Sequence, residues 1–274
     1  MVILNMSKMG QPLKTATTAH IAEYCQTLNG NTICITLDTL HNTFSRYKKL
    51  NVQNGFIDDG FVNLDKLINF IINNKDSHII IDCGVSIFDS MVNYLVEHDI
   101  TSLFQSKNID LFLVSIIEGG VNTLECIQDF YTLSKIPHVN LVVIDDERMG
   151  PTRIENKEFF ETRAYISAVD NGAVFGEIHF TMLYKHHKPY LLKMLRMKLL
   201  FSELENNDSD FNPRGKLFTV YELQKVKRYL WSNFDQAFSK DSNTKTTLKK
   251  ARDGKNVWFA MVKHHNGDET EHSI

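Results

Sequence analysis

Short apolar runs alternate with longer segments of helical periodicity from residue 2 to residue 178, and this alternation constrains the fold more than any other feature. The expected strands are Val2–Asn5, Ile33–Leu37, His78–Asp82, Leu111–Ile117, Leu141–Ile144 and Ala173–Ile178. Runs that are apolar on both sides are typical of a parallel sheet covered on both faces. The expected helices between them are Thr15–Leu28, Val62–Asn74, Ile87–His98, Val121–Ser134 and Lys157–Ala168. The pattern predicts a three-layer α/β fold with a doubly wound, mostly parallel sheet.

The remainder of the chain has a different pattern. Helical spacing of leucines and aromatic residues predicts two C-terminal helices, Leu183–Leu204 and Phe218–Phe238. Residues 239–274 are polar, apart from the short apolar run Val257–Val262. We therefore expect one domain over 1–238, with its helical C-terminal appendage, followed by a mobile polar tail that docks at most one short strand.

Composition excludes several classes of protein. The 274 residues are 43% hydrophobic and 23% charged, which is typical of a globular chain and not of a disordered one. The net charge of -3 and pI of about 6.4 give no global basic field for nucleic acid. No apolar run reaches the roughly 18 residues of a membrane span, and the N-terminus lacks a signal-length apolar core. We expect a cytoplasmic protein without a membrane span.

The four cysteines, Cys25, Cys34, Cys83 and Cys126, lie far apart and form no C-x-x-C pair. This spacing indicates neither a zinc ribbon nor a thioredoxin-type redox pair. We expect most of them to be small buried hydrophobes.

A polar loop follows the first expected strand and leads into the first expected helix. This is the position of a phosphate-binding loop, which needs glycines, a lysine that reaches the phosphates and a hydroxyl that holds Mg²⁺. Lys14 and Thr15 supply the lysine and the hydroxyl. The residues that we assign to nucleotide binding here are Gly10, Gln11, Pro12, Leu13, Lys14, Thr15 and Ala16.

The loop departs from the pattern G-x-x-x-x-G-K-[ST] at its two glycine positions, which hold Lys8 and Leu13. A Cβ at residue 13 opposes positive φ and crowds a phosphate. Taken alone, the segment is equally consistent with an ordinary strand-to-helix turn that has Thr15 near the helix N-cap.

Two aspartates come directly after apolar strands, Asp38 after the second and Asp82 at the end of the third. The carboxyl ends of parallel strands meet at one edge of a sheet, so Lys14, Thr15, Asp38 and Asp82 should converge there. A carboxylate at this position stands beside the Mg²⁺ of a phosphoryl-transfer site. Alone, Asp82 is equally consistent with a helix N-cap or a turn residue.

At these residues the chain resembles the ParA/MinD branch of P-loop NTPases and, more narrowly, the TraL-type nucleotide-binding proteins of conjugative plasmids. The resemblance extends to about Phe238 and includes the segments Asp38–Arg46, Asp82–Phe88, Tyr94–Asp99, Gly119-Gly120, Gly150-Pro151 and Lys157–Phe160. It implies a P-loop fold and an ATP-dependent switch in plasmid conjugation or maintenance, which forms a homodimer and has a conjugation or plasmid-maintenance protein as partner.

The resemblance also implies residue roles. Lys14 would contact the phosphates and take part in catalysis, Thr15 would hold Mg²⁺, Asp38 would orient the attacking water, and Asp82 would stand near the metal. The implied cofactors are ATP and Mg²⁺.

Three departures from the family pattern fall on chemistry-bearing positions. Leu13 is one; Met9 stands where the family has a signature lysine, with Lys8 one place earlier; and Asp146-Glu147 replaces an adenine-contacting Asn-Pro. Each loss of a preorganised contact to a transferring phosphoryl group costs roughly 10²–10³ in rate. The sequence therefore leaves open a slow NTPase, a binding-only switch and a nucleotide-free interaction scaffold. In either nucleotide-binding form, the resemblance places Asp146 near the base.

Basic residues gather in the C-terminal part of the chain and suggest nonspecific DNA as a further partner. They are Lys185, His186, Lys188, Lys193, Arg196, Lys198, Lys225, Lys227, Arg228, Lys245, Lys249, Lys250 and Arg252. The alternative is that they line the wet face of amphipathic helices. The pairs His186-His187 and His264-His265 lack nearby residues that would complete a metal site, so solvated surface is favoured there.

Overall fold

A computed structural model of the chain describes residues 1–8, 14–58, 60–147, 150–180, 193–206 and 216–238, together with two strands in the C-terminal segment. Four of the residues assigned to the phosphate loop, Gly10, Gln11, Pro12 and Leu13, therefore lie outside the described residues, as does Met9. The histidine pairs at 186–187 and 264–265 also lie outside them.

A seven-stranded sheet forms the centre of the domain, in the order β11-β8-β7-β1-β6-β2-β3. Every pair of neighbours in it is parallel. The strands are β1 (Val2–Asn5), β2 (Thr32–Thr36), β3 (Gln53–Asn54), β6 (His78–Asp82), β7 (Leu111–Glu118), β8 (Asn140–Asp146) and β11 (Val174–Phe180). All six strands expected from the sequence are present, and the predicted α/β class is confirmed.

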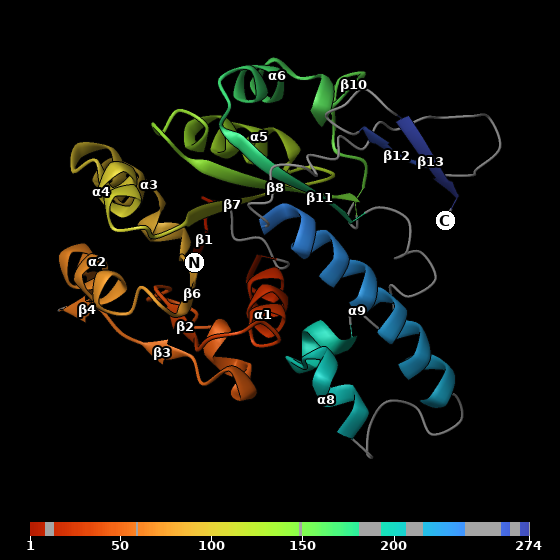
Figure 1. Cartoon of the computed structure of the whole chain (residues 1–274), viewed down its shortest axis with the longest axis horizontal. Coiled ribbons are helices and arrows are strands. Elements are labelled where there is room, and N and C mark those ends of the chain that lie inside the picture. Colours follow the sequence, from red (N-terminus) through yellow and green to blue (C-terminus); the bar gives the residue numbers. More distant parts are fainter. Residues whose placement is uncertain are drawn as a thin grey trace.

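Helices cover both faces of this sheet (Figure 1). One face packs against α2 (Leu64–Asn73), α3 (Phe88–Glu97), α4 (Ile100–Ser106), α5 (Thr123–Leu133) and α6 (Arg163–Asp170). The other face packs against α1 (Lys14–Cys25), α8 (Phe201–Asn206) and α9 (Lys216–Phe238). The result is the expected three-layer arrangement, with the C-terminal helices completing the second outer layer.

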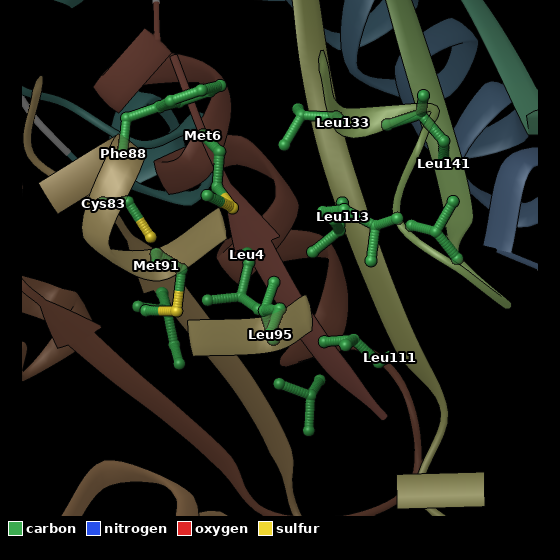
Figure 2. Packing of buried hydrophobic residues seen from close by; sticks show 14 of the residues in the cluster. Leu4, Met6, Cys83, Phe88, Met91, Leu95, Leu111, Leu113, Leu133 and Leu141 are labelled. Carbon is green, nitrogen blue, oxygen red and sulfur yellow. The ribbon is translucent and has the colours of Figure 1, made fainter. Parts of the chain in front are cut away.

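Successive residues of β1 enter different cores, which explains why the strands are apolar throughout. Val2 and Leu4 belong to the core under α2–α6, whereas Ile3 belongs to the core under α1, α8 and α9. Figure 2 shows the first of these cores, where Leu4 lies near Met91 and Leu95 of α3. A strand buried on both faces cannot alternate with polar residues, so period-2 patterning is absent.

The expected helix over Lys157–Ala168 is wrong in its first half. Residues Lys157–Glu158 form strand β10, which pairs antiparallel with β9 (Arg153–Ile154), and a short 3-10 helix (Phe159–Glu161) follows. The α-helix starts only at Arg163, because the side chain of Thr162 accepts a hydrogen bond from the backbone N–H of Tyr165 and caps it. Helix α4 and the small hairpin of β4 (Ile57–Asp58) and β5 (Phe61–Val62) were not expected.

The expected continuous helix over Leu183–Leu204 is also wrong within the described residues. Lys198 has a φ of 56°, in the left-handed region, so an α-helix cannot pass through it, and α8 begins at Phe201. Residues 181–192 lie outside the described ranges. Helix α9 agrees with the expected Phe218–Phe238 and approaches β11 closely, because a Cβ at Gly176 would lie 2.6 Å from the carbonyl oxygen of Ala237.

The C-terminal segment contains strands β12 (Phe259–Lys263) and β13 (Glu269–Ser273), which pair antiparallel. The expected short strand at Val257–Val262 overlaps β12, whereas the polar sequence of β13 gave no signal for a strand. All four cysteines are buried and free, as expected of small hydrophobes. Among the described residues, no helix combines the length and apolarity needed to cross a membrane.

Candidate functional site

Lys14 and Asp82 meet at the carboxyl edge of the sheet. Strands β1 and β6 pair with Asn5 beside Asp82, so the start of the loop to α1 lies next to this carboxylate. The Lys14 ammonium lies 3.1 Å from Asp82 Oδ1 and also donates to the carbonyl oxygen of Cys83. Lys14 is 5% exposed and Asp82 is 1% exposed, so the two form a buried ion pair.

The same carboxylate receives two hydroxyl groups from the first turns of α1. Thr15 Oγ1 donates to Asp82 Oδ2 at 2.8 Å, and Thr18 Oγ1 lies 3.1 Å from Asp82 Oδ1. The side-chain amide of Asn5 donates to the carbonyl oxygen of Lys14 at 3.0 Å and to Thr18 Oγ1 at 2.8 Å. The end of β1 therefore fixes the start of α1 relative to Asp82.

The sequence reasoning did not include Asn5 or Thr18. Two signals could have found them. Asn5 is a polar residue at the end of an otherwise apolar strand, and Thr18 lies one turn into the helix from Lys14. Ala16, which the sequence assigned to nucleotide binding, is buried in the first turn of α1.

The donor set of this cluster fits a Mg²⁺-nucleotide. An ammonium and backbone N–H groups at a helix start favour phosphate oxygens. Mg²⁺ is bound in proteins by few side-chain oxygens and keeps several waters, which matches one threonine hydroxyl and one carboxylate. No group of three or more His, Cys, Asp or Glu in the described ranges could hold a metal ion.

Asp38 lies at the end of the neighbouring strand β2. Its Oδ1 accepts hydrogen bonds from the backbone N–H groups of Leu40 and His41, at 3.0 and 3.1 Å, which shapes the turn after β2. Its backbone is pressed against Gly84, where a Cβ would lie 2.9 Å from the Asp38 Cα. The structure thus brings Asp38 to the same edge as Asp82. The described hydrogen bonds of Asp38 are made with residues of its own turn.

The start of the loop is anchored by a residue from a distant helix. Asp129 of α5 accepts from Ser7 Oγ at 3.1 Å and from the backbone N–H of Lys8 at 2.7 Å. Burial raises the pKa of Asp129, and its hydrogen bonds to Lys8 and Ser7 oppose that shift. The Lys8 ammonium pairs with Asp89 at 2.6 Å and lies over the ring of Phe88. Sequence reasoning missed Asp129 and Asp89, which no local pattern marks.

Asp146 lies at the same edge but apart from the cluster of Lys14 and Asp82. It is fully buried at the end of β8, beside Glu118 of β7, and β7 lies between β8 and β1. The loops that follow β7 and β8 touch there, since a Cβ at Gly119 would lie 1.8 Å from the carbonyl oxygen of Gly150.

A second polar cluster, unmarked in the sequence, joins β8, β11 and α6. His179 Nδ1 lies 3.3 Å from Asp145 Oδ2, and Asp145 Oδ1 accepts from Thr152 Oγ1 at 2.6 Å. Tyr165 donates to Glu177, whose other oxygen lies 3.7 Å from His179 Nε2. Burial lowers the pKa of His179, but the hydrogen bond to Asp145 and the charges of Asp145 and Glu177 outweigh it and raise the pKa to about 9.

Two of the basic residues expected to bind DNA rest on aromatic rings. The ammonium of Lys198 lies 5.8 Å from the ring centroid of Tyr47, and that of Lys227 lies 5.5 Å from the ring centroid of Trp231. Burial lowers the pKa of Lys198, and the charge of Arg46 adds to this. The basic residues at 185–188 and 245–252 lie outside the described ranges.

Lys14 and Thr15 at the start of α1 thus meet Asp82 at the end of β6, which is the convergence expected from the strand order. Among solved structures, the chain is similar to the MinD cell division protein of Aquifex aeolicus, with a TM-score of 0.43, 15% identity, and coverage of 84% of this chain and 97% of that one. It is also similar to a ParA family ATPase from Chlorobium tepidum TLS, with a TM-score of 0.45, 14% identity, and coverage of 87% and 97%.

No protein-family model matches the chain. Curated relatives do match. A Protein TraL of Escherichia coli is 32% identical over 231 residues, which cover 82% of this chain and 92% of the relative. Another Protein TraL of Escherichia coli is 30% identical over 171 residues, which cover 60% and 69%. At this identity and coverage, the chain belongs to the TraL family.

Proposed function

We propose that the chain is a nucleotide-dependent switch of plasmid conjugation or maintenance that binds ATP with Mg²⁺ at the cluster of Lys14, Thr15 and Asp82. The observation that carries the proposal is the convergence of these residues on one carboxylate, with Thr15 Oγ1 at 2.8 Å and the Lys14 ammonium at 3.1 Å from Asp82. A buried ammonium, a hydroxyl and a carboxylate at one sheet edge are the groups that a Mg²⁺-triphosphate requires.

Each side chain has a distinct role in this proposal. Lys14 binds phosphate oxygens, and Asn5 holds the helix start that presents it. Thr15 offers its hydroxyl to the metal, while Asp82 accepts a hydrogen bond from Thr15 and balances the charge of the metal. Asp38 orients a water from the end of β2. Bound Mg²⁺ would neutralise charge on the phosphates, and turnover is expected to be slow because Met9 and Leu13 replace residues of the family loop.

Binding has to displace an existing interaction. In the structure, Lys14 already has two acceptors, Asp82 and the carbonyl of Cys83. This observation favours a second candidate function, a nucleotide-free scaffold in which the pair only stabilises the fold. The two candidates differ in whether a Mg²⁺-nucleotide stabilises the protein.

The deciding experiment measures thermal unfolding with Mg-ATP, Mg-GTP and Mg²⁺ alone. A ligand that binds only the folded state at 100 times its Kd adds about 2.7 kcal/mol to stability. We expect a shift with nucleotide that Lys14→Met abolishes and that Lys66→Met, at an exposed pair on α2, leaves unchanged. No shift with any nucleotide in a folded protein would contradict the proposal and favour the scaffold.

Two threonines provide a matched test of the metal role. Thr15 and Thr18 both donate to Asp82, but Thr15 is at the loop and Thr18 is fully buried one turn further on. We expect Thr15→Val to remove the dependence of nucleotide binding on Mg²⁺ and Thr18→Val to retain it. Equal dependence in both variants would contradict Thr15 as a metal ligand.

We also propose that nucleotide promotes a homodimer through this edge. Exposed apolar side chains follow the carboxyl ends of three strands, Leu40 after β2, Val85 after β6 and Val121 after β7. Sedimentation with and without Mg-ATP tests this, with Val121→Asp expected to keep the protein monomeric. An unchanged mass with bound nucleotide would contradict it.

Nonspecific DNA is a further proposed partner of the basic C-terminal surface. Phosphate contacts release counterions, so DNA affinity should fall steeply between 50 and 200 mM salt. Arg196, which is exposed before the break at Lys198, is the described residue to substitute first. Affinity that is flat over this salt range would contradict the proposal.

A further inference from the structure

The outer edge of β2 is only partly occupied. Strand β2 pairs with β6 from Thr32 to Thr36, whereas β3 pairs only with Ile35 and Thr36 on the other side. Within the part of the chain that the structure describes, no strand lies beside Thr32–Cys34 on that side. β3 therefore leaves an empty section along the outer edge of β2, beside Thr32–Cys34.

The backbone before β3 explains why this section is empty. A short 3-10 helix, Lys48–Leu50, ends at Asn51, which has a φ of 47° in the left-handed region. A residue in this conformation turns the chain away from an extended path. The chain consequently pairs with β2 only from Gln53 onward.

The empty section presents backbone hydrogen-bonding groups. The carbonyl of Asn31 accepts from the N–H of His78 at 2.7 Å, and the N–H of Leu37 donates to the carbonyl of Asp82 at 2.9 Å. The odd-numbered residues of β2 thus face β6. Successive residues of a strand direct their backbone groups to opposite sides, so the N–H and C=O of Thr32 and the N–H of Cys34 point to the open side. The C=O of Cys34 is used by the pairing of Ile35 with Gln53.

A cavity of about 410 Å³ lies against this open edge. Its walls include Gln26 near the end of α1, Asn31 before β2, and Leu50, Asn51 and Gln53 on the side of β3. Every residue that lines it is uncharged. The Thr32 Oγ1 atom is buried and has no hydrogen-bond partner among the described residues, which marks a polar group that a ligand would satisfy.

We propose that this cavity is a docking site for an extended segment of a partner protein, which adds about three residues to the sheet in line with β3. Donors and acceptors at strand spacing are complemented by another extended backbone, the mode known as strand addition. Three residues of strand span ~10 Å. The uncharged lining selects a segment with uncharged side chains, because a buried charge would have no counterion there.

This site is separate from the proposed nucleotide site. Thr32 is at the amino end of β2, whereas Asp38 follows its carboxyl end, at the edge that carries Lys14 and Asp82. The docking proposal therefore does not depend on whether the chain binds nucleotide.

The experiment selects binders from a displayed library of random heptapeptides on the full-length chain. Synthetic copies of selected peptides are then titrated against wild type, Gln53→Lys and Asn54→Lys. Both positions are exposed on β3, but only Gln53 lines the cavity. Hydrogen exchange of the Thr32 and Cys34 backbone amides of the protein is then measured with and without each peptide. Thermal unfolding confirms that each variant is folded.

We expect the selected peptides to be uncharged and to slow exchange at Thr32 and Cys34. They should bind at least 10-fold more weakly to Gln53→Lys than to wild type, whereas Asn54→Lys should bind them as wild type does. N-methylation of alternate peptide residues should weaken binding by a similar factor. Peptides that leave the exchange unchanged, or a selection that yields no binder sensitive to Gln53→Lys, would overturn the proposal. A dimer of the free chain that Gln53→Lys dissociates would overturn it in favour of a second copy as the occupant.

Discussion

The ammonium of Lys14 and the carboxylate of Asp82 lie 3.1 Å apart, both almost completely buried, although 68 positions separate them in the sequence. Their pairing joins the start of α1 to the end of β6. The interaction ties these two elements together at the carboxyl edge of the sheet. The proposed nucleotide binding and the stability of the fold should therefore be linked through this pair.

Asp82→Ala should lower the free energy of unfolding by about 3–5 kcal/mol, because it leaves a buried ammonium without its counter-charge. Urea unfolding monitored by circular dichroism measures the change. Asp58→Ala is the matched control, since Asp58 pairs with Lys66 at 2.7 Å with both side chains exposed, and it should leave stability unchanged. Equal effects of the two substitutions would show that burial does not govern the Lys14–Asp82 interaction.

Gly119→Ala should destabilise the fold, because the new Cβ would lie 1.8 Å from the carbonyl oxygen of Gly150. Both partners are backbone, so the loops after β7 and β8 must separate, and overpacking of this kind costs about 1–3 kcal/mol. Thermal unfolding tests this against Gly55→Ala, where nothing lies within 4 Å of the new Cβ. A Gly119→Ala variant as stable as Gly55→Ala would show that these loops can part freely.

Much of the fold and part of the site could be predicted because they depend on local pattern. Runs apolar on both sides identified β1 and β6 with their observed bounds, Val2–Asn5 and His78–Asp82. The meeting of Lys14, Thr15 and Asp82 follows from the rule that parallel strands end at one edge. Position along a strand was enough to predict it.

Other contacts depend on pairs of residues that no local pattern links. Ser7 and Asp129, 122 positions apart, meet only because α5 packs against β7, the strand next to β1. The cluster of His179 and Asp145 likewise needs the register of β8 and β11. The break at Lys198 was missed because a lysine, unlike glycine, gives no signal for a left-handed residue.

Glu23→Ala should release α8 from α1. The buried Glu23 carboxylate accepts from the backbone N–H groups of Phe201 and Ser202, at 3.0 and 2.6 Å, which are the first groups of α8. Leaving these donors without an acceptor costs roughly 1–3 kcal/mol. Hydrogen exchange of the α8 amides should accelerate accordingly, while Glu125→Ala, at an exposed position on α5, should leave it unchanged. Unaltered exchange in Glu23→Ala would show that other contacts hold α8.

The pH dependence of stability should carry the signature of His179. Burial opposes its protonation, but Asp145 and Glu177 raise its folded pKa to about 9, above the ordinary value of 6.5. The folded state therefore holds this proton more tightly than the unfolded chain. The resulting stabilisation is complete below pH 6.5 and is lost as pH rises through 9, with a slope of at most about 1.4 kcal/mol per pH unit.

Urea unfolding of wild type and His179→Gln from pH 6 to pH 10 isolates this contribution, since glutamine keeps a hydrogen-bonding group toward Asp145 without the titrating charge. The free energy of unfolding should decline more steeply with pH in wild type than in His179→Gln, whereas His41→Gln, in an exposed turn, should follow wild type. Parallel curves for wild type and His179→Gln would mean that His179 is neutral between Asp145 and Glu177.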